Sequence, residues 1–211
     1  MARQMLQAAD FKMKKEPRQA RSRATVKAIV EAGARILVER GYAGLTTNAV
    51  ADVAGVSIGS VYEFFPGKEA IVARLADTLL EDVSRTLNAR IELTDRREDL
   101  HRAMRHLIGA LHGLVYQHRR LLKVLIFQVP FVQQLPSAQQ LQRELLQVVV
   151  NGLQKSREHY QLTVPSSTLY LMATSTAGSL LHLVLMAPPG VDSKAVLDDL
   201  ARKMADWLEQ G

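Results

Sequence analysis

The stretch Thr47–Phe65, TNAVADVAGVSIGSVYEFF, predicts two short helices joined by a sharp turn. Gly55 lies at the turn, where a residue without a Cβ atom lets the chain reverse direction tightly. Ala51, four residues earlier, is small enough to let a second helix cross closely, and Val61 would face it from that helix. This spacing is typical of a helix-turn-helix, whose second helix enters the major groove of DNA.

The polar residues of this motif divide by the DNA chemistry that they suit. Hydroxyl and ammonium groups bind phosphate oxygens, whereas the leading turn of the second helix lies nearest the base edges. That turn has no Arg, Asn or Gln for bidentate base contacts, so we expect DNA shape and backbone contacts to contribute to specificity. The predicted DNA-binding residues are Thr46, Thr47, Ser57, Ile58, Gly59, Ser60, Tyr62 and Lys68. We expect Glu63 to point away from the DNA; the alternative is that it selects cytosine.

The excess positive charge of the chain lies beside this motif. Residues 1–27 contain eight Lys or Arg against Asp10 and Glu16, a net charge of +6, which equals the formal charge of the whole chain. Such an arm can neutralise phosphates and release counterions, although a charged, solvated terminus is the alternative. We expect deletion of residues 1–20 to lower DNA affinity and its salt dependence while leaving the fold intact.

The residues around the second helix also resemble a known family. The segment VYEFFPGKEAI, residues 61–71, resembles a signature of TetR-family transcriptional regulators, and residues 28–57 resemble the rest of their DNA-binding domain. The resemblance covers about residues 24–75. Phe64 and Gly67 depart from the family pattern, in which a polar residue and a Ser are frequent at these positions. The resemblance implies a homodimer with a ligand-binding C-terminal domain.

Helical periodicity dominates from Ala24 onward, and alternating strand-like runs are absent, so the expected fold class is all-α. We divide the chain into a basic arm at residues 1–23, a helix-turn-helix domain at 24–75 with its motif at 47–66, and a helical ligand-binding and dimerisation domain at 76–211. Helices are expected at 24–40, from Lys68 to about Asn88, at 100–118, from 119 towards 130, at 137–159, at 166–187 and from 193 to about 208.

The apolar faces of the C-terminal helices support two further expectations, each with ordinary intrachain packing as its alternative. A small, largely apolar effector would bind among Leu107, Leu111, Phe127, Phe131 and Met172. The resemblance implies a four-helix dimer interface, with one helix pair from each subunit. Its predicted residues are Leu169, Ala173, Thr176, Leu180, Leu197, Leu200 and Met204.

Catalytic patterns are missing from the sequence. The six histidines do not pair at the spacing of three or four residues that metal sites on one helix use, and there is no GxSxG elbow or phosphate-binding Gly loop. We therefore expect no enzyme activity, no cofactor and no metal. The lack of cysteines fits a reducing cytoplasm, and no segment is expected to span a bilayer.

These observations favour a cytoplasmic transcriptional regulator, most simply a repressor that a small effector releases from a near-palindromic double-stranded operator. The expected partners are that DNA, a second copy of the chain and an effector of unknown identity, with no membrane partner. The alternative is an effector-independent or architectural DNA-binding protein of the same fold that acts through protein partners. An enzyme with an appended DNA-binding module is disfavoured by the missing catalytic residues.

Overall fold

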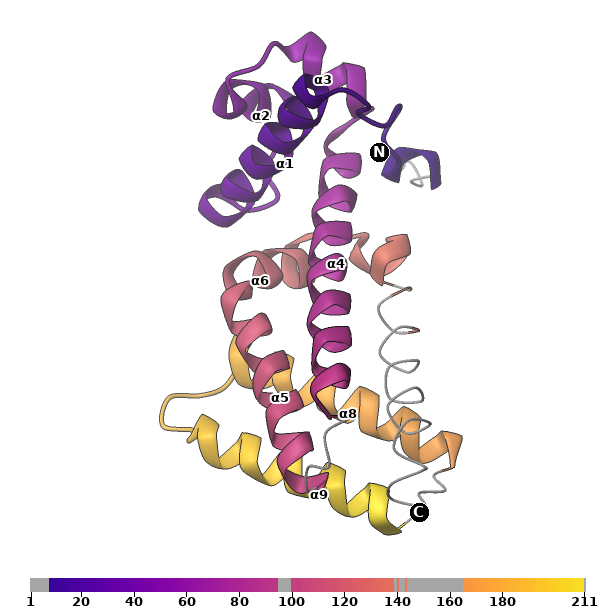
Figure 1. Cartoon of the computed structure of the whole chain (residues 1–211). Helices are drawn as coiled ribbons and strands as arrows, with labels where there is room; N and C mark the ends of the chain where they lie inside the picture. Colours follow the sequence, from indigo (N-terminus) through magenta and orange to yellow (C-terminus); the bar gives the residue numbers. More distant parts are fainter. Residues whose placement is uncertain (1–7, 95–99, 139, 141–142, 144–164, 211) are drawn as a thin grey trace. The chain divides into compact units, whose positions relative to one another are not determined.

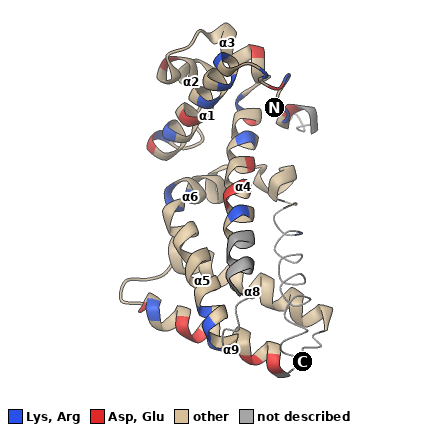
Figure 2. Cartoon of the chain, viewed as in Figure 1, with Lys and Arg blue, Asp and Glu red and all other residues tan. Residues whose placement is uncertain are grey.

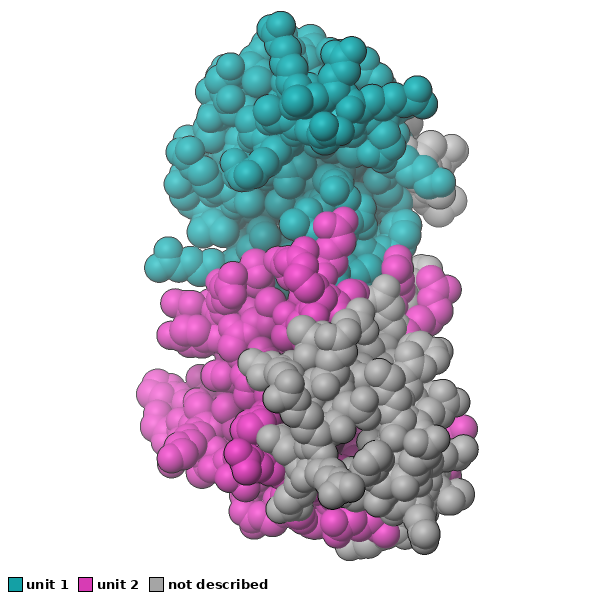
Figure 3. Space-filling view, viewed as in Figure 1, with its two compact units in different colours: residues 1–80, 120–139 teal, residues 81–119, 140–211 magenta. Residues whose placement is uncertain are grey.

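The computed structural model describes residues 8–94, 100–138, 140, 143 and 165–210, and Figure 1 labels their helices. All regular elements in these ranges are helical, as the periodicity predicts. The chain forms two compact units, residues 1–80 with 120–139 and residues 81–119 with 140–211, which are coloured separately in Figure 3. Residues 120–139 therefore lie in the first unit, whereas the sequence assigned them to the ligand-binding domain.

The first unit contains the helix-turn-helix. Its elements are η1 (Ala8–Phe11), α1 (Ala20–Arg40), α2 (Thr47–Ala54), α3 (Ile58–Phe64), the first half of α4 (Lys68–Thr94), most of α6 (Arg119–Gln128) and η2 (Val132–Gln134). Helix α1 begins four residues before the predicted start. Ser22 Oγ accepts the Gln19 N–H at 3.1 Å and so caps the N-terminus of the helix there. Helix α4 continues six residues beyond Asn88 and is shared by both units.

The turn between α2 and α3 has the predicted geometry. Gly55 adopts a left-handed conformation, with φ 67° and ψ 33°. The Val56 N–H donates to the Ala51 carbonyl at 3.1 Å and the Gly55 N–H to the Asp52 carbonyl at 3.3 Å, which is a Schellman ending. Thr46 Oγ1 accepts the Ala49 N–H and Ser57 Oγ accepts the Ser60 N–H, both at 3.1 Å, so a hydroxyl side chain caps the start of each helix.

One hydrophobic cluster holds the first unit together. Ala51 and Val61 are both buried in it, as the spacing across the turn predicts. The cluster also takes in residues far along the chain, namely Val124, Leu125, Val129, Phe131 and Leu135. Its largest fully buried side chains include Ile29, Ile36, Leu37, Leu45, Phe65 and Ile71. The α2–α3 pair is thus fixed on α1, the start of α4 and the end of α6.

The second unit is built on α5 (Leu100–Gln117), α8 (Ser166–Leu185) and α9 (Ser193–Gln210), which pack on one another around a separate cluster. Helix α9 is capped by Asp192, whose carboxylate accepts the N–H groups of Lys194 and Ala195. The cluster contains Leu100, Ile108, Leu169, Met172, Leu180, Ala201, Met204, Ala205 and Leu208. The helix predicted at residues 137–159 falls mostly outside the described residues.

Helix α8 bears on the expectation that no segment spans a bilayer. Its 20 residues include an 18-residue window of mean hydropathy 1.3, so by length and composition it is apolar enough to cross a membrane. One such helix is weak support for a membrane segment, because the core helices of water-soluble proteins pass the same test. Only 17% of that window is buried in the chain, although Leu169, Met172 and Leu180 lie in the core of the second unit.

Candidate nucleic-acid interface

Helix α3 divides into a buried face and an exposed face. Val61 and Phe64 are buried in the core of the first unit. The opposite face exposes Ile58, at 39%, and Tyr62, at 44%, together with Gly59. An exposed apolar side chain beside exposed hydroxyls suits a base-edge surface, since Ile58 can pack on a thymine methyl group. Because Gly59 has no Cβ atom, the backbone can approach a ligand closely.

Hydroxyl groups pair across and along the motif. Thr47 Oγ1 of α2 lies 3.1 Å from the Tyr62 hydroxyl of α3, and Ser57 Oγ lies 2.9 Å from Ser60 Oγ. The first pair links the two helices of the motif, so two predicted phosphate-binding groups lie side by side. A hydroxyl is both donor and acceptor, so these pairs can remain while a further bond is made to DNA.

Lys68, at the start of α4, is held by an aromatic side chain. Its ammonium nitrogen lies over the Tyr42 ring, 4.2 Å from the centroid, in a cation–π contact. The Tyr42 hydroxyl donates to Glu69 at 3.2 Å, and burial and the Glu69 carboxylate raise the pKa of Tyr42 above its ordinary value. Tyr42 therefore stays protonated and donates, which fixes the ring under the ammonium group.

Gln128, at the end of α6, joins the same group of residues. Its Oε1 accepts the backbone N–H of Tyr42 at 3.1 Å. Gly41, which follows α1, has φ 68°, and a Cβ atom there would lie 2.4 Å from Gln128 Oε1. The positive φ favours glycine at this position, and a Cβ atom would also displace the Gln128 side chain. Nothing in the sequence near Gly41 indicates that a residue 87 positions later contacts it.

The described part of the basic arm, residues 8–23, is part of the folded unit, which argues against the expectation that the fold stays intact without residues 1–20. Phe11 is 9% exposed, and its ring centroid lies 5.3 Å from that of Phe131. The Lys14 N–H donates to the Phe64 carbonyl at the end of α3, at 2.8 Å. Removing residues 1–20 would therefore remove a core side chain. Figure 2 shows that Lys and Arg continue along α1.

The five predicted pocket residues do not share one cluster. Phe131 is 2% exposed in the core of the first unit, where Tyr42 meets it edge to face at 5.8 Å. Phe127, also in the first unit, is 52% exposed. Leu111 and Met172 pack in the cluster of the second unit, and Leu107, on the same helix as Leu111, is partly buried. The effector site remains a prediction, and three of its predicted residues, Leu107, Leu111 and Met172, lie in the second unit.

The predicted dimer residues lie mostly within the chain's own core. Leu169, Ala173, Leu180 and Met204 are less than 10% exposed, and Thr176 Oγ1 donates to Met204 Sδ at 3.4 Å. Leu197 and Leu200 are partly buried against the same cluster. Intrachain packing therefore accounts for these side chains. The same two helices and the turn between them instead expose Tyr170, Leu171, Met186, Val191, Val196 and Trp207, which we call the exposed apolar set.

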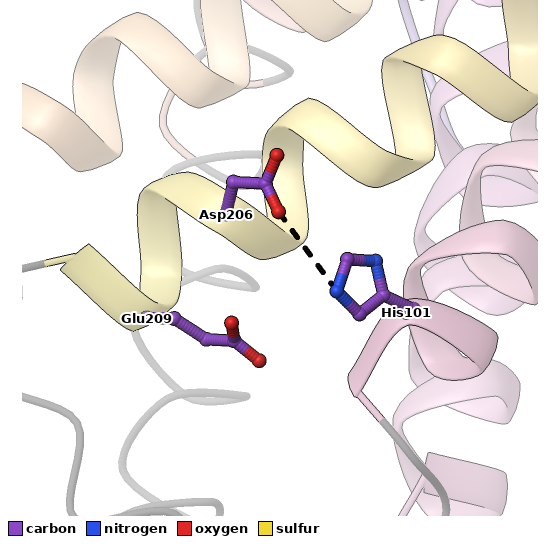
Figure 4. Close-up of side chains that lie close together, drawn as sticks. All are labelled: His101, Asp206 and Glu209. Carbon is purple, nitrogen blue, oxygen red and sulfur yellow. Dashed lines mark ion pairs between the residues drawn. The ribbon is translucent and has the colours of Figure 1, made fainter.

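One group of possible metal ligands lies in the second unit. Figure 4 shows His101 of α5 facing Asp206 and Glu209 of α9, with one ligand atom of each within 4.8 Å of the others. Histidine spacing along a single helix could not predict this group, because its members come from two helices. His101 Nε2 and Asp206 Oδ1 lie 3.8 Å apart, a separation at which the two side chains form an ion pair whenever the imidazole is protonated. Exposed acidic groups are also common without an ion.

The first unit thus has the geometry of a helix-turn-helix DNA-binding domain. Residues 29–75 match the family model described as bacterial regulatory proteins, tetR family. The chain therefore carries, at residues 29–75, a DNA-binding domain of the kind that this family model describes. A curated relative, the HTH-type transcriptional repressor DhaR of Mycobacterium sp. (strain GP1), is 33% identical over 64 residues, which is 30% of this chain and 32% of that protein. The match therefore spans about a third of the repressor's length.

Solved structures resemble the chain over most of its length. A putative TetR-family transcriptional regulator from Mesorhizobium loti has a TM-score of 0.70 and 19% identity, covering 89% of this chain and 96% of that one. The regulator FadR from Bacillus subtilis, solved in complex with stearoyl-CoA, has a TM-score of 0.63 and 17% identity, covering 88% and 98%. At these identities the likeness establishes the fold.

Proposed function

We propose that the chain is a cytoplasmic, DNA-binding transcriptional repressor that reads its operator with α3. The exposed face of α3 carries the argument: Ile58, Gly59 and Tyr62 face outward while Val61 and Phe64 fix the helix in the core. The Thr47–Tyr62 hydroxyl pair and Lys68 supply phosphate-binding groups beside it. The curated match to a repressor, 33% identical over 64 residues, supports the proposal.

The proposed active form is a homodimer. A repressor of this kind binds two half-sites, so two copies of α3 must be held together. The exposed apolar set on α8, α9 and the turn between them offers apolar side chains for burial against a second copy of the chain. This assignment replaces Leu169, Ala173, Leu180 and Met204, which the intrachain core already covers.

The first experiment measures binding and footprint on duplex DNA. A two-fold dimer should protect a near-palindrome whose half-site centres lie roughly 34–36 Å apart, or a multiple of that distance. Sedimentation of the complex should give two chains, or an even number, per operator. Protection of one asymmetric half-site by a single chain would contradict the proposed dimer.

Release by a small effector is the finer part of the proposal, and effector-independent action through protein partners is its alternative. The second unit, with Leu107, Leu111 and Met172, is the proposed site. Stearoyl-CoA, which the structurally similar FadR binds, is a suitable first probe because its acyl chain is long and apolar. By linkage, an effector that weakens DNA binding must bind the free protein more tightly than the DNA complex, by the same factor.

We expect that factor to be about 5–150, the usual range of effector coupling. Isothermal titration of the probe into free protein and into the operator complex measures both affinities. Binding that is equal in the two titrations would exclude effector release by that probe, however tight the binding is. Leu111→Trp should weaken the probe's binding and leave operator binding within a few-fold, which separates the effector site from the DNA site.

A further inference from the structure

The recognition helix carries one acidic side chain on its exposed side. Glu63 follows Tyr62, and its side chain is 49% exposed. Even with the Glu63 side chain directed away from the base edges, an unpaired carboxylate there would lie near the phosphates that Tyr62 and Lys68 are proposed to bind. Like charges across an interface oppose association, so a helix of this composition needs a nearby cation to bind DNA well.

That cation comes from the segment in front of α1. We define residues 8–19 as the strap. It is fixed at three points: Phe11 is buried against Phe131, the Lys14 N–H donates to the Phe64 carbonyl at 2.8 Å, and Gln19 caps α1 through Ser22. The middle point lies on the last residue of α3. The backbone of the strap is therefore held in a fixed position beside the C-terminal end of α3.

Lys15, the residue after that middle point, lies against Glu63. Its Nζ and Glu63 Oε1 form an ion pair, and the same nitrogen lies 5.1 Å from the centroid of the Phe64 ring. Both contacts are made to α3 from a backbone that the Lys14 hydrogen bond already fixes. The pair therefore forms without a further cost for ordering the backbone of the strap at this point.

We propose that Lys15 is the built-in counter-ion of Glu63 and, through it, a positioning residue for DNA binding by α3. This inference rests on the proposed function of α3. Exposed pairs of this kind contribute little to folding stability, so the effect of Lys15 lies in the charge that the recognition helix presents. The strap supplies that charge without placing a long basic side chain in the base-reading turn of α3.

The test compares DNA affinity in four proteins: unmodified, Lys15→Ala, Glu63→Gln and the double variant. Lys15→Ala should lower affinity about tenfold, because it leaves two unpaired carboxylates per dimer near phosphates. The double variant should return to the affinity of the unmodified protein, and Lys15→Arg should keep it. If Lys15 instead binds phosphate directly, the double variant stays as weak as Lys15→Ala, and the proposal is wrong.

Lys12→Ala is the matched control, because it removes the same charge from an exposed position on the same strap. Glu63→Gln should not restore the DNA affinity of Lys12→Ala. If Glu63→Gln restores the affinity of Lys12→Ala and Lys15→Ala equally, the effect depends only on net charge, and the proposal that Lys15 is the specific partner of Glu63 is wrong. A change in preferred bases in Glu63→Gln would assign Glu63 to cytosine and also overturn it. Failure of the unmodified protein to bind any duplex would instead overturn the proposed function of α3, and this inference with it.

Discussion

Replacing Phe131 with Ala is expected to destabilise the first unit by about 3–5 kcal/mol, the usual cost of removing a buried phenyl ring. Phe131 is 2% exposed, and its ring contacts those of Phe11 and Tyr42. The substitution therefore leaves a cavity at the point where the strap, the end of α1 and the segment after α6 meet. Chemical denaturation, followed by far-ultraviolet circular dichroism, measures the change in stability.

Phe127→Ala is the matched control, since it removes the same ring from a side chain that is 52% exposed. Its stability should change by no more than about 0.5 kcal/mol. Both phenylalanines were predicted as pocket residues from helical periodicity. Equal, small effects of both substitutions on stability would contradict the burial of Phe131 in the first unit and return it to the effector site.

Lys68→Ala and Tyr62→Phe are expected to weaken binding to all duplexes by a similar factor, because they remove phosphate-binding groups that carry no base information. Without the Lys68 charge, the slope of log affinity against log salt should fall by about one for each phosphate that Lys68 neutralises. Fluorescence anisotropy at several salt concentrations measures both quantities. Tyr62→Phe keeps the ring and should leave the salt slope unchanged, which makes it the internal control for charge.

Ser60→Ala and Ile58→Ala should act differently, because both residues lie in the leading turn of α3. We expect them to change which duplexes are preferred and to leave non-specific affinity almost unaltered. Ser60 Oγ lies 2.9 Å from Ser57 Oγ, so Ser60→Ala also removes the hydrogen-bond partner of the Ser57 hydroxyl, which caps α3. Melting temperatures of all four variants check that the fold is retained before their affinities are compared.

The helix-turn-helix could be predicted from the sequence because its determinants are local. Gly55, the caps Thr46 and Ser57, and the spacing of Ala51 and Val61 all lie within a few residues of the structure that they specify. A glycine in the left-handed conformation usually ends a helix, and a hydroxyl residue just before a helix usually caps its N-terminus. The same stretch carried the family resemblance, so the site and the family were predicted together.

Longer-range packing could not be predicted in the same way. Helical periodicity indicates that a side chain is buried but not what covers it. Phe131 was therefore placed in a ligand pocket and Leu180 in a dimer interface, whereas both pack within the chain. Nothing near Phe11 in the sequence indicates that its partner lies 120 residues later. Contacts of this kind depend on how segments far apart in the chain pack together, which local patterns in the sequence do not reveal.

Selection of bound duplexes from a random DNA pool, carried out in parallel with the unmodified protein, Ser60→Ala and Lys68→Ala, tests the central claim most directly. The unmodified protein should enrich a near-palindrome with two half-sites. Ser60→Ala should enrich a sequence that differs at the same position in both half-sites, and Lys68→Ala should enrich the original sequence at lower affinity. Failure of the unmodified protein to enrich any sequence, or identical selected sequences from the unmodified protein and Ser60→Ala, would contradict base reading by the leading turn of α3.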